Sequence, residues 1–148
     1  MKHLAIRPIE AADTRWLRHV VLRPTQAPET LIYPGDDDSA SGHYGAFDGE
    51  ALVGIASVYP QPREGDDRPG QWRLRGMAVI DELRGSGIGE RLLSATVDHA
   101  RGGGGSLFWC TARTTASGFY VRHGMRIVGD EFELPRIGPH VLMEMPLS

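Results

Sequence analysis

The residues of this chain best suited to chemistry are three glycines spaced two apart, Gly85, Gly87 and Gly89. They lie between a strand-like run and a helix-like run, in the stretch LRGSGIGERLL at positions 83–93. Because glycine has no Cβ, such a turn can aim successive N–H groups, and the positive end of the next helix, at a phosphate. The pattern predicts a nucleotide or coenzyme site. The alternative is a flexible loop that precedes an ordinary helix.

Two familiar phosphate-binding motifs do not fit this spacing. A Walker loop requires Gly-Lys-Ser/Thr, but no lysine follows these glycines, and Lys2 is the only lysine of the chain. A dinucleotide-binding fingerprint requires a third glycine where this chain has Leu92. A mononucleotide site is therefore disfavoured. The pattern that remains is Arg-x-x-Gly-x-Gly, formed by Arg84, Gly87 and Gly89.

Two blocks of the chain resemble one known family. The run RGSGIG at 84–89 is similar to the acetyl-coenzyme A (acetyl-CoA) signature of the GCN5-related N-acetyltransferase (GNAT) superfamily. A second run, ASGFYVRHGM at 116–125, resembles its later Ala-x-x-Phe-Tyr-x-x-x-Gly-Phe element, with Met125 in place of the last Phe. The resemblance implies an α/β GNAT fold, with a mixed sheet of about seven strands and three to four helices, as a single domain over residues 1–148.

The resemblance also implies where the coenzyme binds. In this fold the strand ending near Val79 and the strand carrying Cys110 splay apart, and the pantetheine arm pairs with the exposed main chain, much as an added strand would. The pyrophosphate then meets the N–H groups of the glycine turn, and Arg84 adds a positive charge. The cofactor-binding residues implied are Met77, Ala78, Val79, Arg84, Gly85, Ser86, Gly87, Ile88, Gly89, Arg113 and Phe119.

Acyl transfer from a thioester requires a neutral amine, a polarised carbonyl and a proton for the departing thiolate. By resemblance, Tyr120 is the catalytic acid, because the family motif places this hydroxyl near the coenzyme sulfur. The alternative is a tyrosine packed on a helix face with its hydroxyl at the surface. The main-chain N–H of Met77 or Ala78 is expected to bind the thioester carbonyl.

The general base is left open by the sequence. Many members of the family carry a glutamate on the strand before the glycine turn, but here Arg73 and Arg75 occupy that strand. His140 is our catalytic candidate, because the turn Gly-Pro-His aims its ring and histidine titrates near neutral pH. A purely structural His140, the weaker candidates Glu131 and Glu133, and removal of the proton through water remain alternatives.

Two functions follow from these residues. The first is an N-acetyltransferase that moves an acetyl group from acetyl-CoA to a primary amine of a small molecule or peptide, by direct attack in a ternary complex. The second is a non-catalytic acyl-CoA sensor or interaction module with the same fold. Intact Arg84, Gly87, Gly89 and Tyr120 favour the enzyme, whereas the missing carboxylate slightly favours the sensor.

The elements of the first half must bring these residues together. Residues 4–9 read as a strand, and residues 11–22 as a helix with Trp16, Leu17, Val20 and Val21 at helical spacing. Residues 23–42 read as a surface loop. Its Asp36-Asp37-Asp38 run is either a solvated turn or an acidic rim that attracts cationic amines. Residues 43–47 and 51–59 predict a hairpin.

The second half contains both motifs. Residues 61–70 read as an exposed connector, and residues 71–80 as a strand with Trp72, Leu74, Gly76, Ala78 and Ile80 on one side. The helix after the glycine turn has an apolar stripe and ends at residues 102–105. A strand at 107–111, a short helix at 116–123 capped by Thr114 or Thr115, and strands at 126–134 and 140–147 complete the chain. The stripe consists of Ile88, Leu92, Leu93, Val97 and Ala100.

Composition narrows the remaining choices. The chain has 148 residues, 41% of them hydrophobic, and a net charge of −3, which argues against nucleic acid or an anionic membrane as partner. The start, Met1 to Leu4, lacks the apolar core of an export signal, and the lone Cys110 excludes an internal disulfide, so we expect a cytoplasmic protein. The six histidines are dispersed, so no metal is expected. The exposed faces of the closing strands could pair in a homodimer.

Overall fold

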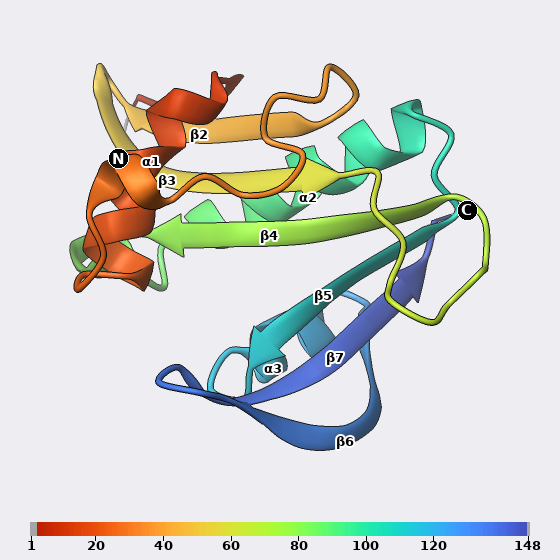
Figure 1. Ribbon diagram of the computed structural model, residues 1–148. Coiled ribbons are helices and arrows are strands. Elements are labelled where there is room, and N and C mark those ends of the chain that lie inside the picture. The colour runs from red at the N-terminus through yellow and green to blue at the C-terminus, as the bar shows by residue number, and fades with distance from the viewer. Residues whose placement is uncertain (1–2, 148) are drawn as a thin grey trace.

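The computed structural model describes residues 3–147, so Met1 and Lys2, which belong to the stretch used above to argue against an export signal, lie outside it. One seven-stranded sheet runs through the described residues (Figure 1). The strands are β1 (Leu4–Pro8), β2 (Gly42–Asp48), β3 (Ala51–Tyr59), β4 (Gln71–Val79), β5 (Leu107–Arg113), β6 (Arg126–Leu134) and β7 (Gly138–Pro146).

The helices lie on the two faces of this sheet. In Figure 1, α2 and α3 lie behind the sheet, and α1 lies in front of it. The α-helices are α1 (Arg15–Leu17), α2 (Ile88–Gly102) and α3 (Ser117–Arg122). Short 3-10 turns occur at Ala11–Thr14, Pro28–Thr30 and Asp81–Leu83, and a π-helical turn at Arg18–Leu22. This mixed α/β architecture confirms the predicted fold class.

The sheet has the strand order β1-β2-β3-β4-β5-β7-β6. Neighbours are antiparallel except β4 and β5, which run parallel and are connected through α2. These two strands share only three residue pairs, ending at Arg73 and Trp109, and then diverge. Figure 1 shows them opening like a V. The predicted splay between the strand ending near Val79 and the strand carrying Cys110 is therefore confirmed.

The larger hydrophobic core lies between the sheet and the helices α2 and α3. The whole predicted stripe of α2 is buried in it, because apolar residues at helical spacing form one face of the helix. Phe108, Cys110 and Ala112 of β5 join it, as do Val141 and Met143 of β7. The predicted boundaries of β6 agree with the structure at both ends.

The expected apolar stripe of residues 11–22 is wrong for two of its four members. Trp16 is 63% exposed and Val20 46% exposed, whereas Leu17 is buried and Val21 packs beside it. The charged Arg18 is buried instead. The segment is helical, but it changes from 3-10 to α to π winding within twelve residues. A change of winding shifts the angle between successive side chains, so a period of 3.6 residues assigns the wrong face.

The side chains of β4 change from one face of the sheet to the other halfway along the strand. The predicted strict alternation, which placed Trp72, Leu74 and Ala78 on one side, is therefore wrong after Gly76. Trp72, Leu74, Met77 and Val79 pack in the α2 core, whereas Ala78 packs with Leu17 of α1. The pairing with β3 shifts register here, and Gly76 has φ +69°. A bulge at a glycine adds one residue and turns the following side chains over. A Cβ at Gly76 would lie only 3.2 Å from the Tyr33 ring, so the glycine also allows the loop that carries Tyr33 to pack closely against β4.

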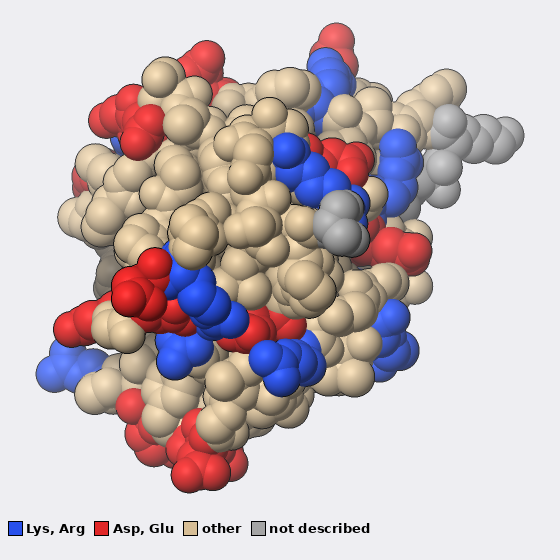
Figure 2. Space-filling view, turned by 90° about the vertical axis from the view of Figure 1, so that its right-hand side faces the viewer, with Lys and Arg blue, Asp and Glu red and all other residues tan. Residues whose placement is uncertain are grey.

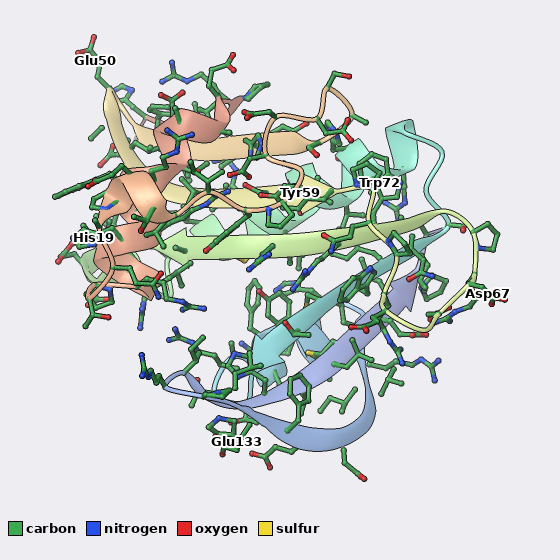
Figure 3. All side chains as sticks on the ribbon, in the orientation of Figure 1. His19, Glu50, Tyr59, Asp67, Trp72 and Glu133 are labelled. Atoms are coloured by element: carbon green, nitrogen blue, oxygen red, sulfur yellow. The ribbon has the colours of Figure 1, made fainter. Side chains whose placement is uncertain are left out.

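The expectation of a solvated turn at Asp36–Asp38 is wrong for its first residue. Asp36 is 5% exposed, and its carboxylate accepts hydrogen bonds from both terminal nitrogens of Arg18, at 2.7 and 3.0 Å. Tyr59 also donates to Asp36, at 2.5 Å, and its side chain on β3 is labelled in Figure 3. Asp37 and Asp38 are exposed. This buried pair fastens the loop to the sheet.

Candidate functional site

The open edge of β4 is the first part of the site. After Arg73, the strand has no ladder partner on the β5 side, although it stays paired with β3 as far as Val79. Met77, Ala78 and Val79 therefore lie on the open side of the V, and their pairing with the coenzyme arm stays a prediction. Backbone groups along such an edge can accept another extended chain as an extra strand.

The glycine turn follows this edge directly. Gly85 has φ +79° and Gly87 has φ +88°, values that favour glycine, and a Cβ added at either would project into open space. Gly87 is the N-cap of α2 and no side chain caps the helix, so its first N–H groups lack a side-chain partner. The Ser86 hydroxyl donates to the Leu83 carbonyl. The turn thus presents free N–H donors at the positive end of a fifteen-residue helix.

Arg84 is exposed beside this turn. One of its terminal nitrogens lies 3.1 Å from Asp81, and both side chains are well solvated. Exposed pairs of this kind are weak and screened by salt, so an anion at the turn can compete for the guanidinium. The residues at 84–89 and the open β4 edge together fit a long coenzyme with a pyrophosphate at one end and an extended arm at the other.

Tyr120 lies beneath the open edge. Its hydroxyl is 3.7 Å from the Met77 sulfur, so the structure brings the second motif next to the open strand β4. Tyr120 is 9% exposed, and burial raises the pKa of its phenol, so the group stays protonated. The surface-hydroxyl alternative is therefore wrong. Burial also raises the pKa of the nearby Cys110 thiol to about 12.

Phe119 faces the glycine turn from α3. A Cβ on Gly89 would lie 3.4 Å from its ring, so the glycine allows α3 to approach the first turn of α2. The Phe119 ring also packs edge-on against Tyr120, with centroids 5.2 Å apart. The predicted cap at Thr114 or Thr115 is wrong. Ala116 is the N-cap, and the Thr114 carbonyl instead accepts a hydrogen bond from Ser117.

His140 lies on the opposite face of the sheet from Tyr120. It pairs with Arg113 across β5 and β7, and its ring lies near Phe132 of β6, 6.2 Å between centroids. Its Nδ1 is 2.9 Å from the Gly138 carbonyl. A carbonyl can only accept, so Nδ1 carries a proton, and Nε2 of the neutral ring keeps a lone pair. Of the weaker base candidates, Glu131 and Glu133 are exposed, and Figure 3 shows Glu133 on the outer strand β6.

Arg113 reaches across the open end of the V. Its guanidinium donates to the Leu22 carbonyl at 3.3 Å, which joins the end of β5 to the end of the N-terminal helical segment. This contact lies on the α1 side of the sheet, opposite Tyr120. The predicted contact of Arg113 with the coenzyme arm therefore stays a prediction, and the side chain has a structural bond of its own.

A cavity of about 420 Å³ opens on the same face as His140, where β4 and β5 begin to separate. The sequence predicts only an exposed connector for residues 61–70, but Gln61 to Glu64 line this cavity together with Arg73. The Trp109 indole fixes that loop by donating to the Gln61 carbonyl at 2.9 Å. No local sequence pattern indicates such a contact, because its partners are 48 residues apart. The other lining residues are Trp109, Thr111, Phe132 and Leu142.

A second hollow, also of about 420 Å³, shares no lining residue with this cavity. It lies where the end of β1 meets the start of β2, beside Asp37, Asp38 and His99. Within residues 3–147, no three His, Cys, Asp or Glu side chains are grouped as a metal site would require. No helix in that range is long and apolar enough to span a bilayer. On the face shown in Figure 2, acidic and basic side chains lie side by side.

Comparisons with known proteins agree with this geometry. The chain is 34% identical over 140 residues to an uncharacterized N-acetyltransferase of Bacillus subtilis, YitI, covering 95% of this chain and 94% of that one. Among solved structures, Ard1 from Thermoplasma volcanium superposes with a TM-score of 0.78 at 15% identity, covering 98% of each chain. An aminoglycoside 6'-N-acetyltransferase complexed with coenzyme A has a TM-score of 0.74 at 16% identity, covering 97% of each.

The similarity to these solved structures, at 15–16% identity, shows the fold alone, whereas the sequence comparison also shows the family. Residues 7–125 match the acetyltransferase (GNAT) family, a span that includes the open β4 edge, the glycine turn and Tyr120. The order of these features along the chain is the one that the resemblance of the two motifs implied. The chain therefore belongs to the acetyltransferase (GNAT) family.

Proposed function

We propose that this protein is an N-acetyltransferase that transfers the acetyl group of acetyl-CoA directly to a primary amine in a ternary complex. One observation carries the proposal. The unpaired edge of β4 leads into a turn of free N–H groups, and the protonated Tyr120 hydroxyl lies below that edge. The coenzyme A complex of the aminoglycoside enzyme of the same fold supports it.

Different residues bind different parts of the coenzyme. Residues 85–89 hold the pyrophosphate through main-chain N–H groups, and Arg84 adds charge when it leaves Asp81. The main chain of Met77, Ala78 and Val79 pairs with the pantetheine arm. Acetyl-CoA supplies the activated thioester, and an N–H group of this edge binds its carbonyl oxygen as negative charge develops there.

Proton transfer uses both faces of the sheet. Tyr120 lies on the α3 face, where it donates a proton toward the departing thiolate. His140 lies on the cavity face, where its Nε2 accepts the proton of the attacking amine, directly or through water. The V between β4 and β5 separates the two groups, so the acceptor enters from the side opposite the acid.

The sensor alternative is favoured by one observation only. Arg73 and Arg75 occupy the strand on which many relatives place a glutamate, and they cannot act as a base at neutral pH. His140 offers a replacement on the same face, so we prefer the enzyme. A mononucleotide binder would leave the open β4 edge unused.

Thiol release tests the proposal. The protein is mixed with acetyl-CoA and a panel of primary amines, small and peptidic, and free coenzyme A is measured over time. Release that depends on both the amine and the protein supports the transferase. Tight binding of acetyl-CoA with no release from any amine favours the sensor, and tight binding of ATP instead contradicts both. A cytoplasmic setting and a homodimer through the closing strands stay predictions.

A further inference from the structure

Two arginines of β4 face the acceptor side of the site. Arg73 lines the cavity at the last pair between β4 and β5. Arg75 follows two residues later, before the bulge at Gly76, and therefore points to the same face. The cavity also contains Arg63 and a single carboxylate, Glu64, among its described lining residues. Arg63 lies 3.9 Å from both Asp66 and Glu144, so the positive charge of this wall that no carboxylate offsets comes from β4.

These two guanidinium groups contact aromatic rings. Arg73 lies over the Trp109 ring, 4.9 Å from its centroid, and Arg75 lies over the Tyr33 ring at 4.0 Å. Among residues 3–147, no carboxylate comes within 4.0 Å of either guanidinium. The Nε of Arg73 is buried without any hydrogen-bond partner. Ring contacts orient a guanidinium but leave most of its N–H donors unused.

Three other arginines show how a carboxylate compensates a guanidinium in this protein. The buried Arg18 has Asp36, and both Arg68 and Arg126 donate to Glu144. Arg73 differs, since it is half-buried beside a second positive charge. Burial lowers the pKa of Arg73, and the charge of Arg75 lowers it further, although an arginine stays protonated. A desolvated cation without a partner is costly, and an anion placed against it removes that cost.

We propose that the amine acceptor carries an anionic oxygen group, a carboxylate or a phosphate, which binds to Arg73 with Arg75 adding positive potential. The inference rests on the proposed function and specifies its substrate class. A planar guanidinium with free donors matches both anions in a bidentate manner. The cavity of about 420 Å³ accommodates a small molecule of this kind beside the end of the β4–β5 ladder.

This proposal reverses the charge suggested by the sequence alone. The run Asp36–Asp38 suggested an acidic rim for cationic amines, but Asp36 is neutralised by Arg18 in the interior. Asp37 and Asp38 line the second hollow, which shares no lining residue with the cavity of Arg73. The acceptor cavity itself favours a negative group.

Matched amine pairs test the inference. The pairs are β-alanine with β-alaninamide and phosphoethanolamine with ethanolamine, so that one member of each carries the anion. Each is assayed by thiol release, and each is titrated calorimetrically into the protein saturated with coenzyme A. The proteins are wild type, R73Q, R75Q, and the control R101Q on the exposed face of α2. Acetyl-CoA affinity is measured for all four.

The wild type is expected to prefer the anionic member of at least one pair by about tenfold or more. R73Q is expected to lose that preference through a higher KM, with acetyl-CoA affinity unchanged, and R101Q to keep it. Preference for β-alanine or for phosphoethanolamine identifies the anion. Equal use of charged and neutral partners, or a preference that survives in R73Q, overturns the inference while leaving the transferase intact.

The binding arm separates the two proposals. Anion-selective binding that R73Q abolishes, without thiol release from any amine, supports the anion site and counts against acetyl transfer. If neither anionic amine binds nor reacts, the inference is overturned, and acetyl-CoA affinity then reports separately on the coenzyme site.

Discussion

The side chain of Tyr120 is positioned by packing more than by hydrogen bonding. Its hydroxyl has only the Met77 sulfur as a partner among the described residues, at 3.7 Å, and a thioether is a weak acceptor. The phenol is nevertheless almost fully buried. Such a group is held in place with its proton available, which suits a donor that acts only when a thiolate forms beside it.

Replacing this hydroxyl is expected to separate binding from turnover. Tyr120→Phe should lower kcat by about a hundredfold, because a positioned acid contributes roughly that much or more, with acetyl-CoA affinity unchanged. The measurements are steady-state thiol release and calorimetric titration. Tyr44→Phe is the control, since the Tyr44 hydroxyl contacts His99 of α2 and lies outside the candidate site. Unchanged kcat in Tyr120→Phe would remove this residue from the mechanism.

The raised pKa of Tyr120 also predicts a pH profile. Burial favours the neutral phenol, so kcat should show no fall attributable to Tyr120 up to about pH 10, the ordinary value for tyrosine. The check is kcat against pH at saturating acetyl-CoA and amine, compared between wild type and Tyr120→Phe. An alkaline break well below that value, present in wild type and absent in the variant, would contradict the account.

Cys110 is expected to be inert in the folded protein. Burial raises the pKa of its thiol to about 12, and only the thiolate reacts with alkylating reagents. At pH 8 iodoacetamide should therefore leave the native chain unmodified by mass spectrometry and modify it fully in urea. Rapid alkylation of the native protein would show that the space beneath the V is open.

At the scale of elements, the glycine turn and α2 act as one unit. The same helix has a second glycine in the left-handed region, Gly104, just beyond its C-terminus, with φ +83° and open space where a Cβ would project. Gly87 at the N-terminus has the same properties, with φ +88°. The two positions therefore have similar backbone strain, but Gly87 lies in the proposed coenzyme site and Gly104 lies at the other end of α2.

This pair provides a matched test of the turn. Gly87→Ala and Gly104→Ala should each lower the free energy of unfolding by about 1 kcal/mol, the order of cost for an L-residue in this conformation. Only Gly87→Ala should weaken acetyl-CoA binding, because its Cβ would enter the space that we propose for the pyrophosphate. Chemical denaturation and calorimetry give the two quantities. Equal affinity in both variants would place the coenzyme elsewhere.

The sequence predicted those elements whose cause is local. The stripe of α2 and the turn at 85–89 follow from spacing and glycine conformation, and both agree with the structure. The bulge at Gly76 was not predicted, because a single glycine in a strand does not by itself indicate a shift in the pairing register with β3. The buried face of residues 11–22 was missed because mixed winding breaks the helical period.

At the scale of the whole molecule, a buried polar network fastens the helical segment of residues 11–22 and the loop of residues 31–36 to strand β3. Arg18 donates to Asp36, to the Leu31 carbonyl and to Ser57 and Tyr59 of β3. Its members come from three segments that are distant in sequence, so no local pattern predicts it. The same holds for the cavity that contains Arg73, which is formed from β4, β5, β6, β7 and the 61–64 loop.

Breaking this network is expected to destabilise the fold. Asp36→Asn should cost about 3–5 kcal/mol, because it leaves the Arg18 charge buried without its partner. Asp37→Asn, at an exposed position next to it, is the control. Burial alone would raise the pKa of Asp36, but hydrogen bonds from Arg18 and Tyr59 outweigh it and lower that pKa.

The lowered pKa of Asp36 fixes the pH range of its contribution. A carboxylate with a folded pKa below its unfolded value of about 3.9 stabilises the protein above that value, and the contribution disappears as pH falls through the folded pKa. The stability difference between wild type and Asp36→Asn should therefore be constant near neutral pH and shrink in acid. Urea denaturation at several pH values measures it, and a difference that grows on acidification would be inconsistent with the pair.

The central claim is that acetyl-CoA lies along the open edge of β4 with its pyrophosphate at the glycine turn. Amide NMR spectra recorded while acetyl-CoA is added test it most directly. We expect the largest shifts at residues 77–79 and 85–89, and little change around Asp37 and His99 in the second hollow. Saturable binding with that pattern supports the account. Absence of binding, or shifts confined to the second hollow, would contradict it.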